Sequence, residues 1–215
     1  MSRSTQSNNT NILDRPLGRS SGRVGGSSDA TSVSLSAFAY VYSELVQYHQ
    51  GRAASVSELE RRLESAGYGV GLKVLEMVAY RSKETKRETR LMSMLQFVSS
   101  SVWKSLFGKA ADSLERSIDH ADEFMIVDYE PITSTFVSVP QDLGQLSADA
   151  YVSGIIAGVL DGAGFSARVT AHSVELEDGE YSKPNTAGMP PRKDKAVFLV
   201  KFSPEVLSRD AALER

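Results

Sequence analysis

The chain of 215 residues carries a formal net charge of −3, has an isoelectric point of about 5.7 and contains no cysteine. This length fits one domain, with or without appendages, and the weak negative charge argues against a general attraction to nucleic acid or acidic lipid. Without cysteine, disulfides, thiolate metal sites, cysteine nucleophiles and S-acylation are excluded, which fits a reducing compartment such as the cytoplasm.

Residues 1–32 are rich in Ser, Asn, Gly and Arg and contain few apolar side chains. The segment lacks both the apolar core of a signal peptide and the amphipathic period of a transit peptide. We therefore expect residues 1–32 to be a disordered basic tail, because such a composition cannot bury enough apolar surface to fold. No apolar run in the chain approaches the ~20 residues that a membrane span needs.

Between residues 33 and 108 the apolar side chains recur at helical spacing, and no strand pattern appears. Residues 34–49 are predicted to form the first helix. Ser55 and Glu58 match a capping box, which predicts the start of a second helix that ends near residue 65. Three glycines, Gly67, Gly69 and Gly71, are expected to break the helical pattern, which resumes over 72–80. A long helix is expected over 84–107 with Gly108 as its cap, followed by a short helix over 109–118.

From residue 124 onward, short β-rich runs alternate with one helix. A first strand pair is expected at 124–129 and 135–139, followed by a helix over 147–164 that Ser147 caps. A second strand pair at 166–174 and 196–202 encloses the insertion 175–195. Ser203 and Pro204 then open a terminal helix. The sequence therefore predicts an α+β fold, in which an N-terminal helical layer packs on a four-stranded twisted antiparallel sheet with a crossing helix. Residues 33–215 are expected to form one domain, with 175–195 as a disordered insertion.

Small residues recur every four positions in the predicted crossing helix, at Ala150, Gly154, Gly158 and Gly162. Such a smooth stripe lets a helix lie unusually close to a sheet or to another helix. The larger neighbours on either side of the stripe are expected to fill the flanks.

Enzyme signatures are absent, so the sequence predicts no catalytic residue, no metal ligand and no cofactor. His120 lies between Asp119 and Asp122, which we interpret as a solvated linker. Residues 83–90 hold the strongest basic cluster, with Arg81 before it. We interpret this cluster as a solvated helix start or a patch for an acidic protein, because nucleic-acid binding would require more interleaved basic and aromatic residues.

The first predicted helix is more apolar than one chain needs. Ten of the fifteen residues from Leu35 to His49 are apolar, and four polar residues share a narrow strip: Ser36, Ser43, Glu44 and Gln47. The apolar arc therefore spans about 200°, where a surface helix needs about half that. The helix is either fully buried at the centre of the domain, or it turns one flank to its own core and the other to a partner subunit. The residues expected to face a partner are Leu35, Phe38, Tyr42, Leu45 and Val46.

Several motifs, in order along the chain, resemble the small α/β subunits of the TRAPP complex. The most specific lies in residues 102–115 and includes Trp103, Lys104, Leu106, Phe107, Gly108, Lys109 and Asp112. The other matching segments are 34–39, 43–47, 87–89, 138–140, 169–172 and 201–202.

This resemblance implies a helical layer over an antiparallel sheet and pairing through the first two helices with a sister TRAPP subunit of the same fold. It further implies a non-catalytic scaffold in a complex that tethers vesicles between endoplasmic reticulum and Golgi and acts as a nucleotide exchange factor for a Rab-type GTPase. The chain would then be cytoplasmic, contact the GTPase indirectly, and reach the endoplasmic reticulum and cis-Golgi membranes only through the complex.

Two features depart from the family. One family member carries an acyl chain on a cysteine, which this chain lacks, and the 175–195 insertion replaces a tight turn. The alternative is a small-ligand module of related fold that holds a lipid or a haem, for which only His49 and His172 are eligible as axial ligands.

Overall fold

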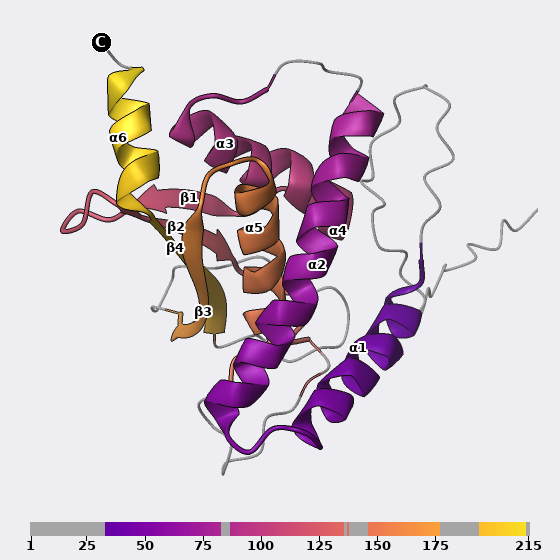
Figure 1. Cartoon of the computed structure of the whole chain (residues 1–215). Helices are drawn as coiled ribbons and strands as arrows, with labels where there is room; N and C mark the ends of the chain where they lie inside the picture. Colours follow the sequence, from indigo (N-terminus) through magenta and orange to yellow (C-terminus); the bar gives the residue numbers. More distant parts are fainter. Residues whose placement is uncertain (1–32, 83–86, 136, 138–145, 177–193, 214–215) are drawn as a thin grey trace, which may run out of the picture.

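The computed structural model describes residues 33–82, 87–135, 137, 146–176 and 194–213, in which helices cover one face of an antiparallel sheet (Figure 1). The expected tail 1–32 and residues 177–193 of the expected insertion lie outside the described residues. The chain order is α1 (Leu35–Gln50), α2 (Val56–Ser82), α3 (Leu91–Phe97), a π-helical turn η2 (Val98–Val102), α4 (Trp103–Phe107), β1 (Ser113–Arg116), β2 (Glu123–Asp128), α5 (Ala150–Gly162), β3 (Ala167–Glu175), β4 (Asp194–Phe202) and α6 (Pro204–Ala212).

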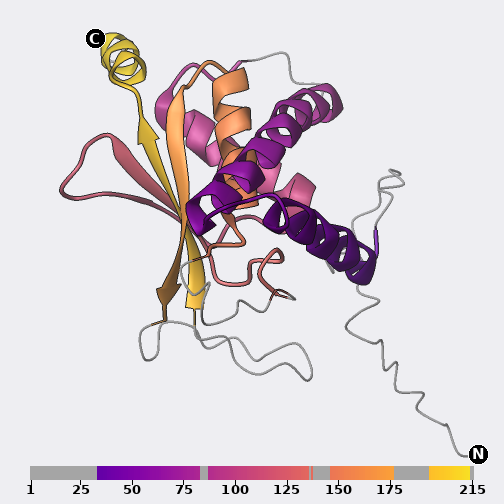
Figure 2. The ribbon, with the colours of Figure 1, turned by 60° about the horizontal axis from the view of Figure 1, so that its bottom comes forward.

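The four strands are all antiparallel, in the order β1-β2-β4-β3. Side chains alternate between the two faces of each strand, and every second residue of β4, including Phe198 and Val200, points into the core. Figure 2 shows α5 lying against this inner face, with α2 and α3 on the same side of the sheet. The expected α+β architecture with a crossing helix is confirmed.

The three glycines at 67, 69 and 71 do not break a helix, so the prediction of two separate helices is wrong. α2 runs through them without interruption, because two of them form the surface against which α5 packs. A Cβ on Gly67 would lie 2.0 Å from the carbonyl oxygen of Tyr151, and one on Gly71 would lie 2.2 Å from that of Ile155. Close packing thus offsets the roughly 0.5–1 kcal/mol that each glycine costs a helix.

The glycines of α5 make the reciprocal contacts. A Cβ on Gly154 would lie 2.0 Å from the carbonyl oxygen of Glu64, and one on Gly158 would lie 2.3 Å from that of Tyr68. The predicted close approach of the crossing helix is confirmed, and its partner is α2.

Two predictions for the middle of the chain are wrong. Residues 109–118 contain the short strand β1 rather than a helix, because Ser113–Arg116 pairs along β2 and half-buries Leu114 against the core. The strand expected at 135–139 is absent from its described residues: Thr135 instead closes a turn in which its hydroxyl donates to the carbonyl oxygen of Pro131 at 2.8 Å. The hairpin partner of β2 is therefore the strand before it.

The long helix expected over 84–107 begins only at Leu91. Residues 83–86 lie outside the described part, and Arg90 is extended. The Asp210 carboxylate on α6 accepts hydrogen bonds from the Leu91 amide at 2.9 Å and from the Arg90 side chain at 3.0 Å, so a distant residue caps α3. The predicted glycine cap is confirmed, because Gly108 ends α4 with a φ of 76°.

The second strand pair is longer than expected. β3 extends to Glu175 and β4 begins at Asp194, and these two residues are paired in the sheet. The ends of the expected insertion are therefore strand. The terminal helix α6 begins at Pro204, directly after Ser203, as predicted.

Candidate partner interface on the first helix

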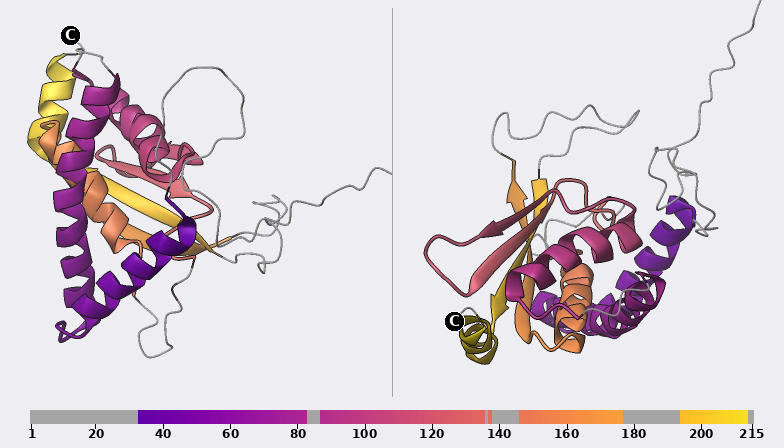
Figure 3. Two further views of the ribbon diagram at one scale, coloured as in Figure 1. Left: turned by 90° about the vertical axis from the view of Figure 1, so that its right-hand side faces the viewer. Right: turned by 90° about the horizontal axis from the view of Figure 1, so that it is seen from above.

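α1 and α2 meet at the turn around Gly51 and diverge from there, so that the start of α1 reaches away from the sheet (Figures 1 and 3). Ser34 caps α1, since its hydroxyl accepts a hydrogen bond from the Ala37 amide at 3.2 Å. At the other end the Arg52 guanidinium donates to the Tyr48 carbonyl at 3.0 Å and lies 3.7 Å from the centre of the Tyr48 ring. Both ends of the helix are therefore fixed by local contacts.

One flank of α1 belongs to the chain's own core. Tyr42 and Val46 are 4% and 8% exposed, and they pack against residues of α2 and α5, among them Leu59 and Leu63. The Tyr42 hydroxyl donates to the carbonyl oxygen of Ala148 at 2.5 Å, and burial raises the pKa of Tyr42 far above its usual range. The expectation that Tyr42 and Val46 face a partner is therefore wrong, because both are covered within this chain.

The opposite flank is apolar and uncovered. At about 100° per residue, Ala37, Val41 and Tyr48 form one stripe along the helix. Val41 is 72% exposed and Tyr48 is 51% exposed. The half-buried Phe38 and Leu45 lie between this stripe and the core face. We call these five residues the outer flank of α1.

The expected partner-facing set is thus divided by the structure. Phe38 and Leu45 border the exposed stripe, Leu35 is half-buried on the core side, and Tyr42 and Val46 are core residues. Val41 and Tyr48, which the structure leaves exposed, were not in the expected set. Both residues belong to the wide apolar arc on the helical wheel. Only the packing of Tyr42 in the core shows which part of that arc stays exposed.

A small apolar cavity lies beside Phe38. It measures about 90 Å³ and is lined by Phe38 of α1, by residues of α2, α4 and α5, and by the loop after β2: Val70, Leu106, Phe107, Ile132, Thr133, Tyr151, Val152 and Ile155. The Thr133 hydroxyl donates to the Asp149 carboxylate, which leaves the wall almost without free polar groups. The cavity therefore suits an apolar group.

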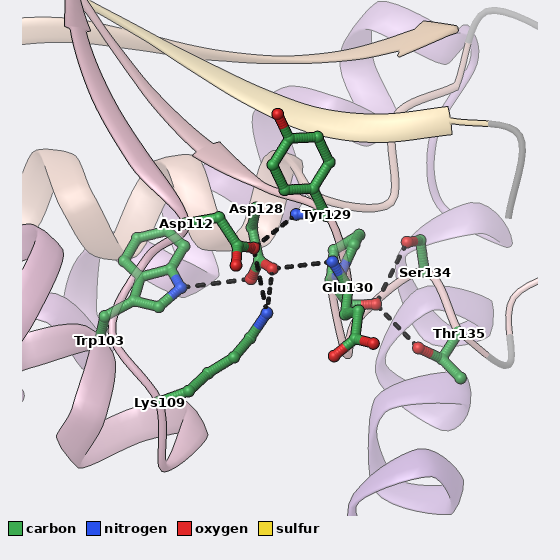
Figure 4. A network of polar contacts seen from close by, with 9 residues as sticks. Trp103, Lys109, Asp112, Asp128, Tyr129, Glu130, Ser134 and Thr135 are labelled. Atoms are coloured by element: carbon green, nitrogen blue, oxygen red, sulfur yellow. Dashed lines mark hydrogen bonds and ion pairs between the residues drawn. The ribbon is translucent and has the colours of Figure 1, made fainter. Parts of the chain in front are cut away.

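The most specific sequence motif builds a buried polar network (Figure 4). Trp103 is 1% exposed, and its indole nitrogen donates to the Asp128 carboxylate at 3.2 Å. The Lys109 ammonium lies 2.5 Å from the other oxygen of Asp128 and 3.3 Å from the Asp112 carboxylate. Burial opposes the charge on Lys109, but Asp128 and Asp112 outweigh it and raise the pKa of this lysine.

The two aspartates of this network also bind backbone amides. Asp112 accepts from the Tyr129 amide at 2.8 Å, and Asp128 accepts from the Glu130 amide at 2.9 Å. The network thereby ties α4 to β1, β2 and the loop after β2. The role of the motif is structural: Leu106 and Phe107 line the cavity, Gly108 turns the chain, and Lys104 is exposed. The motif did not reveal Asp128, which lies 25 residues from Trp103.

The three histidines do not form a ligand site with the cavity, since none of them lines it. His120 lies in the turn between β1 and β2, where its ring and the carboxylates of Asp122 and Glu123 come within 4.8 Å of one another. The Lys201 ammonium is 2.9 Å from Glu123 and 3.6 Å from Asp122, so one cation already offsets part of the acidic charge there.

His172 is exposed on β3 and hydrogen-bonds the Thr170 hydroxyl at 2.9 Å. The His49 ring has a buried Nδ1 without a hydrogen-bond partner, and its pKa is lowered by burial and by Arg62 and Arg52. Neither position supports a haem.

The described arginines of the basic cluster stabilise the fold. Arg87 donates to the Ala163 carbonyl at 2.9 Å at the end of α5, and Arg90 pairs with Asp210 at 3.0 Å. The start of the predicted cluster, residues 83–86, lies outside the described residues.

Comparison with known proteins shows to which family the motif around Trp103 belongs. The family model of the transport protein particle (TRAPP) component matches residues 38–203. The chain belongs to the TRAPP component family. The predicted resemblance is thereby confirmed over most of the described domain.

Two curated relatives share the name trafficking protein particle complex subunit 5. The protein from Dictyostelium discoideum is 42% identical over 201 residues, which cover 94% of this chain and 97% of the relative. The human protein is 42% identical over 203 residues, which cover 94% of this chain and 93% of the relative. The motifs in the sequence also predict a resemblance to the subunit numbered five in animals, and these relatives confirm that resemblance.

A solved structure shows the same fold. It is a crystal structure of a trafficking protein particle complex subunit 3 from Naegleria fowleri covalently bound to palmitic acid. It matches with a TM-score of 0.59 at 20% sequence identity, over 78% of this chain and 93% of that one. The architecture is thus that of TRAPP small subunits. Among the described residues, no helix has the length and apolar character to cross a membrane.

Proposed function

We propose that this TRAPP family member is a non-catalytic scaffold subunit that pairs through the outer flank of α1 with a sister TRAPP subunit of the same fold. The observation that supports this most is the exposure of Val41 and Tyr48 on a helix whose other flank is already filled. An exposed apolar stripe on a helix is the feature by which helices dock into apolar grooves. An obligate interface of this kind buries about 2,000 Å² or more in total, so α1 would be one part of it.

The assembled complex would tether vesicles between endoplasmic reticulum and Golgi and act as a nucleotide exchange factor for a Rab-type GTPase. In this proposal the chain holds its neighbours together and touches the GTPase only indirectly. It is cytoplasmic and associates with the endoplasmic reticulum and cis-Golgi membranes through the complex. The names of the relatives support a trafficking complex, and the lack of enzyme motifs favours a structural role for the chain itself.

The alternative function is binding of a lipid, which the solved subunit 3 carries as covalent palmitic acid. This chain has no cysteine for a thioester. The cavity beside Phe38, which described residues form, measures about 90 Å³ and is smaller than the roughly 150 Å³ site that holds a single benzene ring. A long acyl chain does not fit this space, so the cavity favours the scaffold proposal.

Pairing is tested with Val41→Glu, measured as the Kd for the purified sister subunit with which the chain co-purifies. A carboxylate in the docked flank loses its water without gaining a partner, and we expect the Kd to rise at least 100-fold. Val41 is preferable to Phe38 or Leu45 because it makes no core contact whose loss would unfold the chain.

The matched control is Tyr40→Glu. Tyr40 is 80% exposed but lies on the polar side of the same helix, so its variant should bind like the wild type. Unchanged binding by Val41→Glu would remove the outer flank from the interface.

A further inference from the structure

The cavity beside α1 is continuous with the outer flank. Phe38 belongs to both, since it borders the exposed stripe and also forms part of the cavity wall. The Phe38 ring stacks on the Tyr42 ring, with the ring centres 5.7 Å apart and the planes 5° from parallel. Tyr42 is held by its bond to Ala148, so the Phe38 side of the cavity is fixed in place.

The opposite wall is fixed by the polar network. Leu106 and Phe107 precede Gly108 and Lys109, whereas Ile132 and Thr133 follow Asp128 and Glu130. The Lys109–Asp128 contact therefore joins the two segments that form this wall. Hydrogen bonds that hold both sides pre-organise the cavity, which lowers the ordering cost of receiving a group from outside.

Size and chemistry restrict what that group is. A space of about 90 Å³ holds a few carbon atoms, which matches one branched aliphatic side chain. The wall is apolar, and Thr133 is engaged with Asp149, so a charged or strongly polar group would lose its hydration without compensation. Most of the wall residues are only half-buried, which places the cavity just beneath the surface beside α1: Phe38, Val70, Leu106, Phe107, Ile132 and Tyr151.

We infer that this cavity receives one aliphatic side chain, of the size of Leu, Ile or Met, from the sister subunit that docks on the outer flank of α1. The inference rests on the proposed pairing and adds its anchor point. Anchor residues in apolar pockets near the centre of an interface carry most of its binding energy. The exposed stripe then supplies complementary surface around that anchor.

The first test fills the cavity from within. Val70→Phe places a ring in the space that the partner's side chain would occupy, and we expect the Kd for the purified sister subunit to rise about 10- to 100-fold, the loss of one buried aliphatic side chain. The isolated chain should melt at an unchanged or higher temperature, because the variant fills a void. Val174→Phe adds the same ring on exposed β3 and should change neither quantity.

A second variant and a probe keep the result decisive. Ile132→Phe fills the same cavity from a loop and should weaken binding in the same way if Val70→Phe disturbs α2. Xenon enters small apolar cavities. Under xenon pressure, the methyl NMR signals of Val70, Leu106 and Ile132 should shift in the free wild-type chain and stop shifting once the sister subunit is bound.

Wild-type affinity in both filled variants, or xenon shifts that persist in the complex, would overturn the inference. A fatty acid co-purifying with the wild-type chain and displaced by Val70→Phe would assign the cavity to a lipid instead. The two proposals fail separately. If Val41→Glu abolishes binding while the filled variants bind normally, only the anchor is lost. If Val41→Glu binds normally, the outer flank is not the pairing surface, and the proposed interface is wrong.

Discussion

At the scale of single residues, Trp103, Lys109 and Asp128 show how a family motif serves the fold. The Asp128 carboxylate is 3% exposed and is satisfied by an indole, an ammonium and a backbone amide. A buried carboxylate with this many partners is stable, but it becomes costly as soon as its only counter-charge within hydrogen-bond distance among the described residues is removed. Lys109 is therefore the residue of this network whose loss should matter most.

We expect Lys109→Met to lower the free energy of unfolding by about 2–3 kcal/mol, somewhat less than the roughly 3–5 kcal/mol of a fully buried pair, because the Lys109 side chain is 32% exposed. Urea denaturation measures this change. Lys104→Met is the matched control, since Lys104 is exposed on α4, just before Lys109 in the sequence, and should shift stability by no more than about 0.5 kcal/mol. Equal stabilities of the two variants would show that the ion pair contributes nothing.

At the scale of elements, the packing of α2 on α5 explains both a success and a failure of sequence-based prediction. The stripe from Ala150 to Gly162 correctly indicated a close approach, because its four-residue period is visible in the sequence alone. Gly67 and Gly71 were misassigned as breaks, because glycine has the same low helix propensity whether it ends a helix or touches another backbone. Only the position of α5 distinguishes the two uses.

Gly67→Ala and Gly69→Ala should have opposite effects on the same helix. The new Cβ at 67 meets the backbone of α5 at 2.0 Å, whereas the one at 69 has nothing within 4 Å. We expect Gly67→Ala to cost about 3 kcal/mol, at the upper end of the roughly 1–3 kcal/mol of overpacking. Gly69→Ala should gain about 0.5–1 kcal/mol by helix propensity. Thermal unfolding checks both, and a stable Gly67→Ala variant would contradict the packing described here.

Strand β1 and the outer flank mark the limits of prediction from the sequence. Ser113–Arg116 has no β-rich composition and becomes a strand through pairing with β2, which is a tertiary effect. The glycine cap at Gly108 and the start of α6 at Pro204 were predictable because they depend on local backbone geometry, although the Ser203 hydroxyl makes no capping hydrogen bond. The division of α1 into two flanks could not be predicted. A helical wheel gives the width of the apolar arc, but it does not show which part of the arc packs against the rest of the chain.

At the scale of the whole molecule, the described residues form two apolar clusters of unequal size. The main cluster joins the sheet to α2, α3, α4 and α5. The smaller one holds α1 to α2 and α5 through a few side chains, including Tyr42 and Leu63. The main core contains no residue of α1, and this helix extends from it (Figure 3). Its outer flank is exposed at Val41 and Tyr48. Such an arrangement suits a subunit whose first helix is shared with a neighbour.

The most direct measurement of this account is site-specific photo-crosslinking in the natively assembled complex. A photoreactive residue at position 41 is compared with one at position 40, and the crosslinked protein is identified by mass spectrometry. We predict that position 41 crosslinks to another TRAPP small subunit and that position 40 does not. Crosslinks from position 41 only within this chain, or to a protein outside the TRAPP family, would contradict the assignment of the outer flank as the pairing surface.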